Sequence, residues 1–202
     1  PNIMKNYKLI LAGKLLLPEI ELIENWISLF KIDPKDVIQT GYISDTELVH
    51  LYRNCSLFII PSLHEGFGLP ALEAMCCGAP VIGSNCTSIP EVIVSAQAMF
   101  NPYDVVDIKN LIEKSLTDKL FRLELIQNSR IQSQRFSWKT SALNAISACR
   151  NIISNVNKEL VNHDWFEINK ENLKLFNILI TKLTTNRKIR RNFSDSLMKQ
   201  LA

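Results

Sequence analysis

Residues 61–85 read PSLHEGFGLPALEAMCCGAPVIGSN and contain four of the six glycines in this 202-residue chain. The same stretch holds three prolines and two carboxylates, Glu65 and Glu73, and it lies between two apolar segments. A turn needs only one or two glycines, so this density predicts an unusual backbone path or close contact with a ligand. This stretch is therefore the first candidate for a functional site.

Short apolar runs alternate with helical patterns on both sides of this stretch. Apolar runs that end at glycine or proline predict strands, and apolar residues spaced by three or four predict helices. Ser44 or Asp45 can cap one helix, whose apolar face carries Leu48, Leu51 and Tyr52. Strands are expected at 7–13, 37–41, 56–61, 80–84 and 98–101, and helices at 18–30, 44–55, 70–78, 104–118, 119–132 and 138–153, the last opened by Ser137.

The predicted strands are apolar throughout rather than alternating, which is typical of a parallel sheet covered by helices on both faces. We therefore predict an α/β fold with a doubly wound, Rossmann-like parallel sheet. Such sheets bind ligands beyond the carboxyl ends of their strands. The loops at that edge are expected at 12–14, 40–44, 61–69 and 83–91, so Gly13 and Lys14 join the candidate residues.

Charge separates the chain into two regions. Residues 1–150 carry 14 basic and 15 acidic residues, whereas residues 151–202 carry nine basic and five acidic residues. We expect a Rossmann-like domain at 1–153 and a basic helical extension at 154–202, with helical patterns at 171–184 and 189–201. These helices are expected to pack on the rest of the protein; a peripheral contact with an anionic membrane surface is the alternative.

Composition argues against several classes of protein. No apolar run approaches the roughly 20 residues that a membrane span needs, and no export leader is visible. The five cysteines are odd in number and lack a C-x-x-C pair, so we expect reduced thiols, a cytoplasmic protein and no metal site. No nucleic-acid partner is expected. The first residue is Pro1, which suggests a chain cut from a longer protein.

The glycine-rich stretch predicts a phosphate site. Pro70 suits the first turn of a helix, so the helix N-terminus lies near Gly68 and Leu69, where N–H groups and the positive end of the helix dipole favour an anion. Gly66 and Gly68 carry no side chain, which would let a diphosphate approach the backbone.

The two carboxylates flank that phosphate site. Glu73 follows in the first helical turn, where a carboxylate can accept hydrogen bonds from the vicinal diol of a ribose. Glu65 lies on the other side and would face whatever group the diphosphate carries. The order of carboxylate, phosphate cradle and carboxylate predicts a nucleotide-diphosphate sugar.

Simpler interpretations exist for each residue. Glu73 could only favour its helix dipole, Glu65 could be solvated, His64 is better explained as structural or exposed, and the glycines could form turns alone. Residues 66–71 also fit the G-x-G-x-x-A dinucleotide fingerprint. That fingerprint requires an acid after the next strand, where the sequence has Ser84 and Asn85.

The segment EGFGLPALEAMCCGAPVIGSN, followed by IPEV, resembles the donor site of glycosyltransferase family 4 in the GT-B superfamily. The likeness includes Glu65 and Glu73 with seven residues between them, the preceding Pro61-Ser62, and the following Pro90-Glu91-Val92. It extends to YKLILAGK, to TGYISDTELVHLYRNCSLFIIPS and to RFSWKTSA, and it covers about residues 3–150.

The resemblance implies a retaining transfer from a nucleotide-diphosphate sugar to a glycan or lipid-linked acceptor, without a metal or other cofactor. It implies that Glu65 is the catalytic residue at the donor sugar and that Glu73 binds the ribose. Backbone groups at Gly66, Phe67, Gly68 and Leu69 would hold the sugar and diphosphate. Gly41, Tyr42 and Ile43 would lie against the base.

The sequence also departs from the family pattern. The N-terminal acceptor domain, the first strand and helix of the donor domain, and an Arg–Lys pair at the diphosphate are all missing, and Lys14 does not replace that pair. Two alternatives stay open: a non-catalytic nucleotide-sugar-binding remnant, and a GT-B-fold sugar-nucleotide epimerase. A transferase in the cytoplasm, peripheral to the inner membrane face if the tail contacts lipid, is the expected function.

Overall fold

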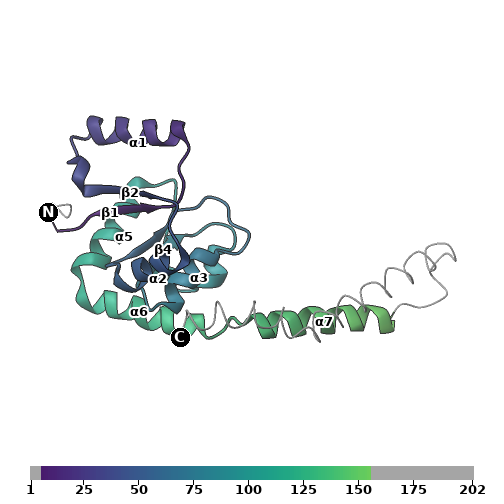
Figure 1. Cartoon of the computed structure of the whole chain (residues 1–202). Coiled ribbons are helices and arrows are strands. Elements are labelled where there is room, and N and C mark those ends of the chain that lie inside the picture. The colour runs from purple at the N-terminus through teal and green to yellow at the C-terminus, as the bar shows by residue number, and fades with distance from the viewer. Residues whose placement is uncertain (1–5, 156–202) are drawn as a thin grey trace. The chain divides into compact units, whose positions relative to one another are not determined.

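The structure is a computed structural model that describes residues 6–155 (Figure 1). Helices and strands alternate, as the sequence predicts. Their order is β1 (Leu9–Ala12), α1 (Leu17–Leu29), η2 (Pro34–Asp36), β2 (Val37–Gly41), α2 (Asp45–Asn54), β3 (Phe58–Ile60), α3 (Leu69–Cys76), β4 (Val81–Ser84), α4 (Ile89–Ile93), η3 (Ala96–Ala98), β5 (Met99–Phe100), α5 (Val105–Thr117), α6 (Lys119–Ser133) and α7 (Trp138–Asn155).

The chain divides into two compact units, residues 1–133 and 134–202. The described part of the second unit is α7 and the residues before it, where the Ser137 hydroxyl accepts a hydrogen bond from the N–H of Thr140. The expected domain limit after residue 153 falls inside α7. The expected basic extension lies outside the described residues, apart from the last two residues of α7, and stays a prediction.

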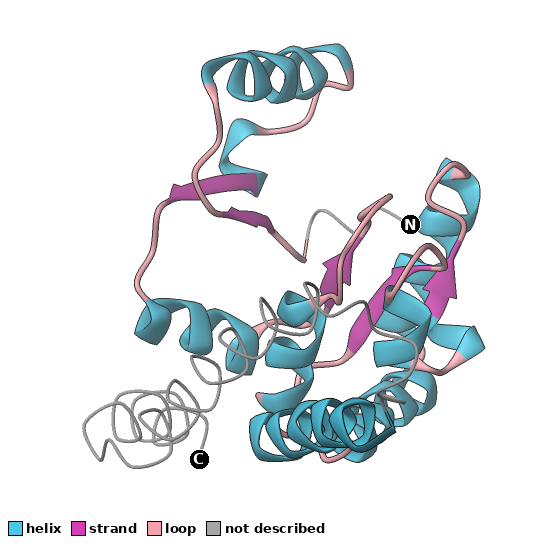
Figure 2. Cartoon of the chain, turned by 90° about the vertical axis from the view of Figure 1, so that its right-hand side faces the viewer, coloured by secondary structure: helices cyan, strands magenta, loops and turns pink. Residues whose placement is uncertain are grey.

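All paired strands of the first unit run parallel, which confirms the predicted fold class. Hydrogen bonds nevertheless divide them into two sheets, β1–β2 and β3–β4–β5. Strands β1 and β3 do not pair with each other. Figure 2 shows the β1–β2 pair near α1, set apart from the other three strands.

The buried core of the first unit surrounds β4. Every residue of β4 is buried, and Ile82 is fully inaccessible. Helices α3, α4 and α6 supply the residues that pack against it, among them Met75, Ile89 and Leu125. All of the buried apolar residues described lie between Tyr52 and Leu125, so the first strand, first helix and second strand contribute none of them.

The segment from β1 to β2 is much more open. Helix α1 has no buried residue, and Trp26 is 50% exposed and Leu29 70% exposed. In Figures 1 and 2, α1 lies on the outer side of the β1–β2 pair, away from β4. One connection to the rest of the unit is the hydroxyl of Tyr7, which donates to the carbonyl of Leu116 at 3.4 Å.

Most predicted elements begin and end within about two residues of their observed limits, and the predicted cap is present. Ser44 accepts a hydrogen bond from the Glu47 N–H at 3.3 Å, and Glu47 accepts one from the Ser44 N–H at 2.8 Å, which forms a capping box. The five-residue helix α4 was not predicted. Residues 85–88 separate it from β4, and Pro90 lies in its first turn.

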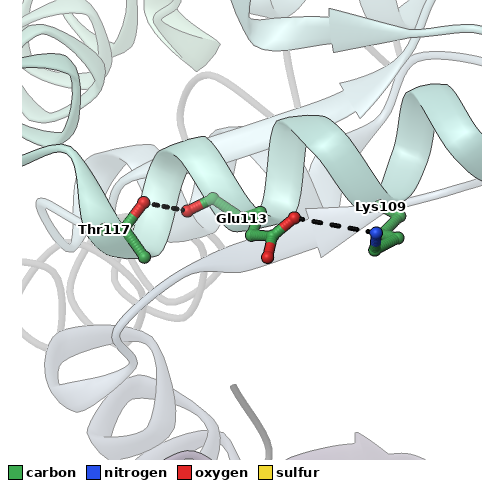
Figure 3. A network of polar contacts seen from close by, with 3 residues as sticks. All are labelled: Lys109, Glu113 and Thr117. Carbon is green, nitrogen blue, oxygen red and sulfur yellow. Dashed lines mark hydrogen bonds and ion pairs between the residues drawn. The ribbon is translucent and has the colours of Figure 1, made fainter. Parts of the chain in front are cut away.

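Helix α5 lies beyond β5 and begins at Asp104, whose side chain accepts hydrogen bonds from the N–H groups of Val106 and Asp107. Figure 3 shows Lys109, Glu113 and Thr117 along this helix. The Lys109 ammonium lies 3.9 Å from Glu113, and the Thr117 hydroxyl donates to the Glu113 carbonyl at 2.7 Å. Lys109 is largely exposed, so this ion pair contributes little to stability.

Within residues 6–155, no helix combines the length and the apolar character that crossing a membrane would require.

Candidate functional site

The glycine-rich loop enters α3 exactly where the predicted phosphate site requires a helix N-terminus. Helix α3 starts at Leu69, with Pro70 in its first turn and with Gly68 as its N-cap in the left-handed region, at φ +92°. No side chain caps this end. The end of α3 therefore offers its backbone N–H groups and positive dipole to a ligand at the carboxyl end of β3.

Gly68 and Gly83 are explained by the fold itself. A Cβ on Gly68 would lie 2.8 Å from Cδ1 of Ile89, in addition to the positive φ. A Cβ on Gly83 would lie within 2.8 Å of atoms of Ile60, Ile89 and Ile93. These two glycines let β4, α4 and the loop pack closely, which accounts for half of the glycines in the stretch without any ligand.

Gly66 is different, because nothing lies within 4 Å of a Cβ built there and its φ is not positive. Neither packing nor backbone conformation requires glycine at this position. The exposed backbone of Gly66, between half-buried Glu65 and exposed Phe67, is therefore open to a ligand. Leu69, the last residue of the predicted cradle, is 44% exposed.

Glu65 is held at three points. Its carboxylate accepts a hydrogen bond from the Ser62 hydroxyl at 2.9 Å. Its backbone N–H donates to Oγ1 of Thr87 at 3.1 Å, and its carbonyl accepts from the Ser88 hydroxyl at 3.0 Å. The loop after β4 therefore fixes the position of Glu65, which is not the behaviour of a freely solvated side chain.

Glu73 lies in the second turn of α3, not in the first turn as predicted, because the helix begins at Leu69. It is contacted by α2. The Tyr52 hydroxyl donates to its carboxylate at 3.3 Å, and the Tyr52 ring packs edge-on against Phe58 with centroids 5.3 Å apart. Tyr52 is buried, and Glu73 is half-buried. A carboxylate that only favoured its helix dipole would need no such partner.

The surroundings shift the pKa of both groups in this pair. Burial raises the pKa of Glu73, the Tyr52 hydrogen bond opposes that rise, and the charge of Asp45 adds to it. Burial and the neighbouring Glu73 carboxylate raise the pKa of Tyr52, so its hydroxyl stays protonated and donates. Asp45 opens α2, which places the start of α2 within electrostatic reach of Glu73.

The loops after β1 and β2 meet each other. The N–H of Gly13 donates to the carbonyl of Gly41 at 3.1 Å, so these two glycines lie side by side at the carboxyl ends of their strands. Tyr42 is 87% exposed, Lys14 is exposed and Ile43 is half-buried. Tyr42 therefore presents an uncovered ring at this edge, as a base-stacking residue would.

The predicted residues thus fall into two groups that are not joined by a described hydrogen bond. One group contains Glu65, residues 66–69 and Glu73 around the start of α3. The other contains residues 13–14 and 41–43 at the ends of β1 and β2. Helix α2 links them in the chain, since it starts just after Ile43 and brings Tyr52 to Glu73.

Several residues at the site were not identified as site residues from the sequence, namely Tyr52, Ser62, Ser84, Thr87 and Ser88. Tyr52 was predicted only for the apolar face of its helix. The hydroxyl-rich run after β4 lies on the predicted ligand edge and could have drawn attention to residues 84–88. His64 is exposed, in agreement with the simpler interpretation.

Metal or disulfide chemistry would need clustered ligands or paired thiols. Within the described part of the chain, no three or more His, Cys, Asp or Glu side chains gather in a way that could hold a metal ion. All five cysteines are free, as expected. Burial raises the pKa of Cys55, Cys76 and Cys77, so these thiols stay protonated near neutral pH.

Comparison with known proteins places this arrangement in a family. The family model of glycosyl transferases group 1 matches residues 2–132. The chain is 46% identical over 145 residues to a serotype-specific mannosyltransferase, WbdA, from Escherichia coli. It is also 43% identical over 108 residues to the O-antigen chain mannosyltransferase B from Escherichia coli.

These matches cover 72% and 54% of this chain but only 18% and 28% of the relatives, so the chain spans less than a third of their length. Among solved structures, sucrose-phosphate synthase from Thermosynechococcus elongatus superposes with a TM-score of 0.65 at 26% identity, over 75% of this chain and 40% of that one. The parallel Rossmann-like architecture is thus that of GT-B glycosyltransferases. The chain belongs to the family of glycosyl transferases group 1.

Proposed function

We propose that this chain is the donor-binding part of a retaining, family 4-type glycosyltransferase that transfers mannose from a nucleotide-diphosphate sugar to a growing glycan. The choice of mannose is supported by the two relatives, which are named as mannosyltransferases. The name of one of them, an O-antigen chain enzyme, supports a polysaccharide acceptor.

The observation that carries this proposal is the placement of two restrained carboxylates around the start of α3. Glu65 precedes the open backbone of Gly66, and Glu73 lies one turn inside the helix. In our proposal, the diphosphate binds the N–H groups at 66–69, the ribose hydroxyls donate to Glu73, and the sugar lies against Glu65. Tyr42 and the neighbouring Gly41 and Ile43 contact the base.

The proposed reaction breaks the bond between the anomeric carbon of the sugar and the diphosphate oxygen. The acceptor hydroxyl forms the new bond to that carbon on the same face, and its proton passes to the leaving phosphate. In this proposal the reaction needs the nucleotide sugar and the acceptor but no cofactor. The N-terminus of α3 stabilises the leaving diphosphate without a metal. No protein nucleophile is assigned.

The coverage of the relatives supports a longer enzyme in which another domain binds the acceptor. Lys14 is proposed to contact the diphosphate only as a secondary residue, since it is exposed and lies with Gly13 at the end of β1. The free cysteines support a cytoplasmic location. Peripheral attachment to the inner membrane face would depend on residues 154–202, which lie outside the described part.

Calorimetric titration of the 202-residue chain with GDP-mannose, UDP-glucose and ADP-glucose tests donor binding. Glu73→Ala should weaken binding of the preferred nucleoside diphosphate about tenfold, because it removes charge-assisted hydrogen bonds. Glu65→Gln should leave that affinity unchanged. If none of the three nucleotides binds, or if Glu73→Ala binds them normally, the proposed donor site is wrong.

Transfer itself is tested in the longer enzyme with labelled donor and glycan acceptors. Glu65→Gln should lower turnover at least a hundredfold, and product stereochemistry should be retained. The 202-residue chain alone should show no transfer, since it would lack the acceptor-binding domain. An inverted product would overturn the retaining assignment, and conversion of the free nucleotide sugar would favour an epimerase.

A further inference from the structure

Three hydroxyl groups hold Glu65: that of Ser62, in the same loop after β3, and those of Thr87 and Ser88, in the loop after β4. Ser62 donates to Oε1 of Glu65 at 2.9 Å, Thr87 accepts from its N–H at 3.1 Å, and Ser88 donates to its carbonyl at 3.0 Å. Thr87 and Ser88 are more than 20 residues away in sequence. Side chain and backbone of Glu65 are therefore both restrained.

These bonds are anchored in the best-packed strand of the unit. The Ser84 hydroxyl donates to the carbonyl of Ser62 at 2.6 Å, and Ser84 is the fully buried last residue of β4. Ser62 is thus fixed through its backbone while its own hydroxyl is used on Glu65. The position of the Glu65 carboxylate is therefore set by β4, through Ser84 and Ser62, and not only by the exposed loop that carries Glu65.

Thr87 adopts a backbone conformation that a β-branched residue rarely takes, with φ +50°. Such strain persists only where surrounding contacts hold it. Here the strained residue supplies the acceptor for the Glu65 N–H, and the next residue supplies the donor for its carbonyl. The strain therefore coincides with the contacts that fix Glu65.

Only one carboxylate oxygen is used by these contacts. Oε1 accepts the Ser62 hydroxyl, and none of the three contacts reaches Oε2. A single hydroxyl donor occupies only one oxygen of a carboxylate. Oε2 can therefore accept a hydrogen bond from a ligand while Oε1 is held.

We propose that Ser62 is a positioning residue for Glu65, and that the loop of Thr87 and Ser88 fixes the Glu65 backbone so that Oε2 faces the donor sugar. This inference rests on the proposed function, because it assumes that Glu65 contacts the sugar. It assigns to Ser62 an effect on turnover and sugar recognition, and none on binding of the bare nucleotide.

The test is Ser62→Ala in the longer enzyme. The variant keeps the backbone carbonyl that Ser84 binds and removes only the hydroxyl on Glu65. We expect kcat to fall about tenfold, with less than a twofold change in affinity for the nucleoside diphosphate. Ser62→Thr keeps a hydroxyl and should restore most of the activity. Ser88→Ala should lower kcat less, by about threefold.

Ser129→Ala is the matched control, because it removes a buried hydroxyl that donates to the Ala79 carbonyl at 2.7 Å, away from Glu65. It should leave kcat unchanged even if it lowers Tm. In a Glu65→Gln background, Ser62→Ala should cause no further loss of kcat, because the two residues act together.

Each other outcome contradicts the inference in a defined way. A Ser62→Ala enzyme with kcat within twofold of wild type, while Glu65→Gln is inactive, overturns the positioning role and leaves the proposed function intact. Equal losses of kcat and nucleotide affinity would make Ser62 a residue of general loop structure. A fully active Glu65→Gln enzyme would overturn the role of Glu65 itself and this inference with it.

Discussion

Strands β1 and β4 are both four residues long and both start with two large apolar residues, yet every residue of β4 is buried, whereas Leu9 and Ile10 of β1 are 44% and 42% exposed. The difference does not come from the strands themselves. Strand β4 pairs on both sides, with β3 and β5, and is covered by helices, whereas β1 pairs only with β2. Burial is therefore set by the neighbours that each strand finds.

The same contrast extends to the candidate site. Glu65, Glu73 and their hydroxyl partners lie on elements attached to the β4 core, and their positions are fixed by several hydrogen bonds. The base-contacting candidate Tyr42 lies at the end of the open β1–β2 pair and is 87% exposed. We infer that the phosphate and ribose part of the site is preformed and that the base part depends more on its surroundings.

The largest expected effect separates the two strands directly. Ile82→Ala should lower the free energy of unfolding by about 2–5 kcal/mol, because it leaves a cavity in the core beside β4. The same substitution at Ile10 should cost about 1 kcal/mol or less, because that side chain is already half in water. Denaturant unfolding of the 202-residue chain measures both, and equal losses would break the comparison.

A pair of glycine substitutions sharpens the comparison between packing and ligand binding. Gly83→Ala should destabilise the fold by about 1–3 kcal/mol, because its Cβ would overlap three isoleucine side chains. Gly66→Ala meets no protein atom, so its stability should stay within about 0.5 kcal/mol of wild type. Its affinity for nucleoside diphosphate should fall several-fold, as calorimetry would show; unchanged binding would mean that Gly66 does not approach a phosphate.

A pH titration tests the proposed role of Glu73 in ribose binding and the role of its partner Tyr52. Burial raises the pKa of Glu73, so nucleotide affinity should begin to fall at a higher pH than for an ordinary glutamate as the carboxylate is protonated. Tyr52→Phe removes the hydrogen bond that opposes this rise, so the fall should move to still higher pH, with a loss of affinity of about threefold at neutral pH.

The stability contribution of Glu73 has the opposite sign. A folded-state pKa above the unfolded value means that the folded chain holds the proton more tightly, so this group favours folding below the unfolded pKa and loses that contribution as pH rises through the folded pKa. Acid should therefore weaken nucleotide binding while Glu73 itself opposes unfolding. Identical affinity-against-pH curves for wild type and Tyr52→Phe would contradict the coupling.

The smallest expected effect lies on α1. Trp26→Lys and Leu29→Lys should change the free energy of unfolding by less than about 0.5 kcal/mol, because neither side chain is buried. Both should reduce self-association of the chain, measured by sedimentation or light scattering, since they remove exposed apolar surface. A loss of stability comparable to Ile82→Ala would show that α1 belongs to the core.

Much of this fold could be predicted locally. Apolar runs that end at glycine marked β2 and β4, and Ser44 and Ser137 marked the starts of α2 and α7. Helix α4 was missed because five residues are too few to show a helical period. The division into two sheets depends on which strands pair across long stretches of chain, which local sequence patterns do not specify.

The candidate site shows the same limit. The positions of Glu65 and Glu73 around a helix N-terminus followed from Pro70, the glycines and the spacing. Their partners did not, since Tyr52 is 21 residues from Glu73, and Thr87 and Ser88 are 22 and 23 residues from Glu65. The sequence also suggested a ligand for Gly68, where contact with Ile89 and a positive φ already require glycine.

The ion pair of Lys109 and Glu113 has a practical consequence for work with this chain. It is the one ion pair described between residues 6 and 133, and it lies on an exposed helix surface. Added salt would therefore screen this pair and few other close charge contacts. Ionic strength should therefore barely alter folding. Strongly excluded salts such as sulfate should instead promote association through the apolar residues of α1, so buffer conditions will govern the colloidal state of the protein rather than its fold.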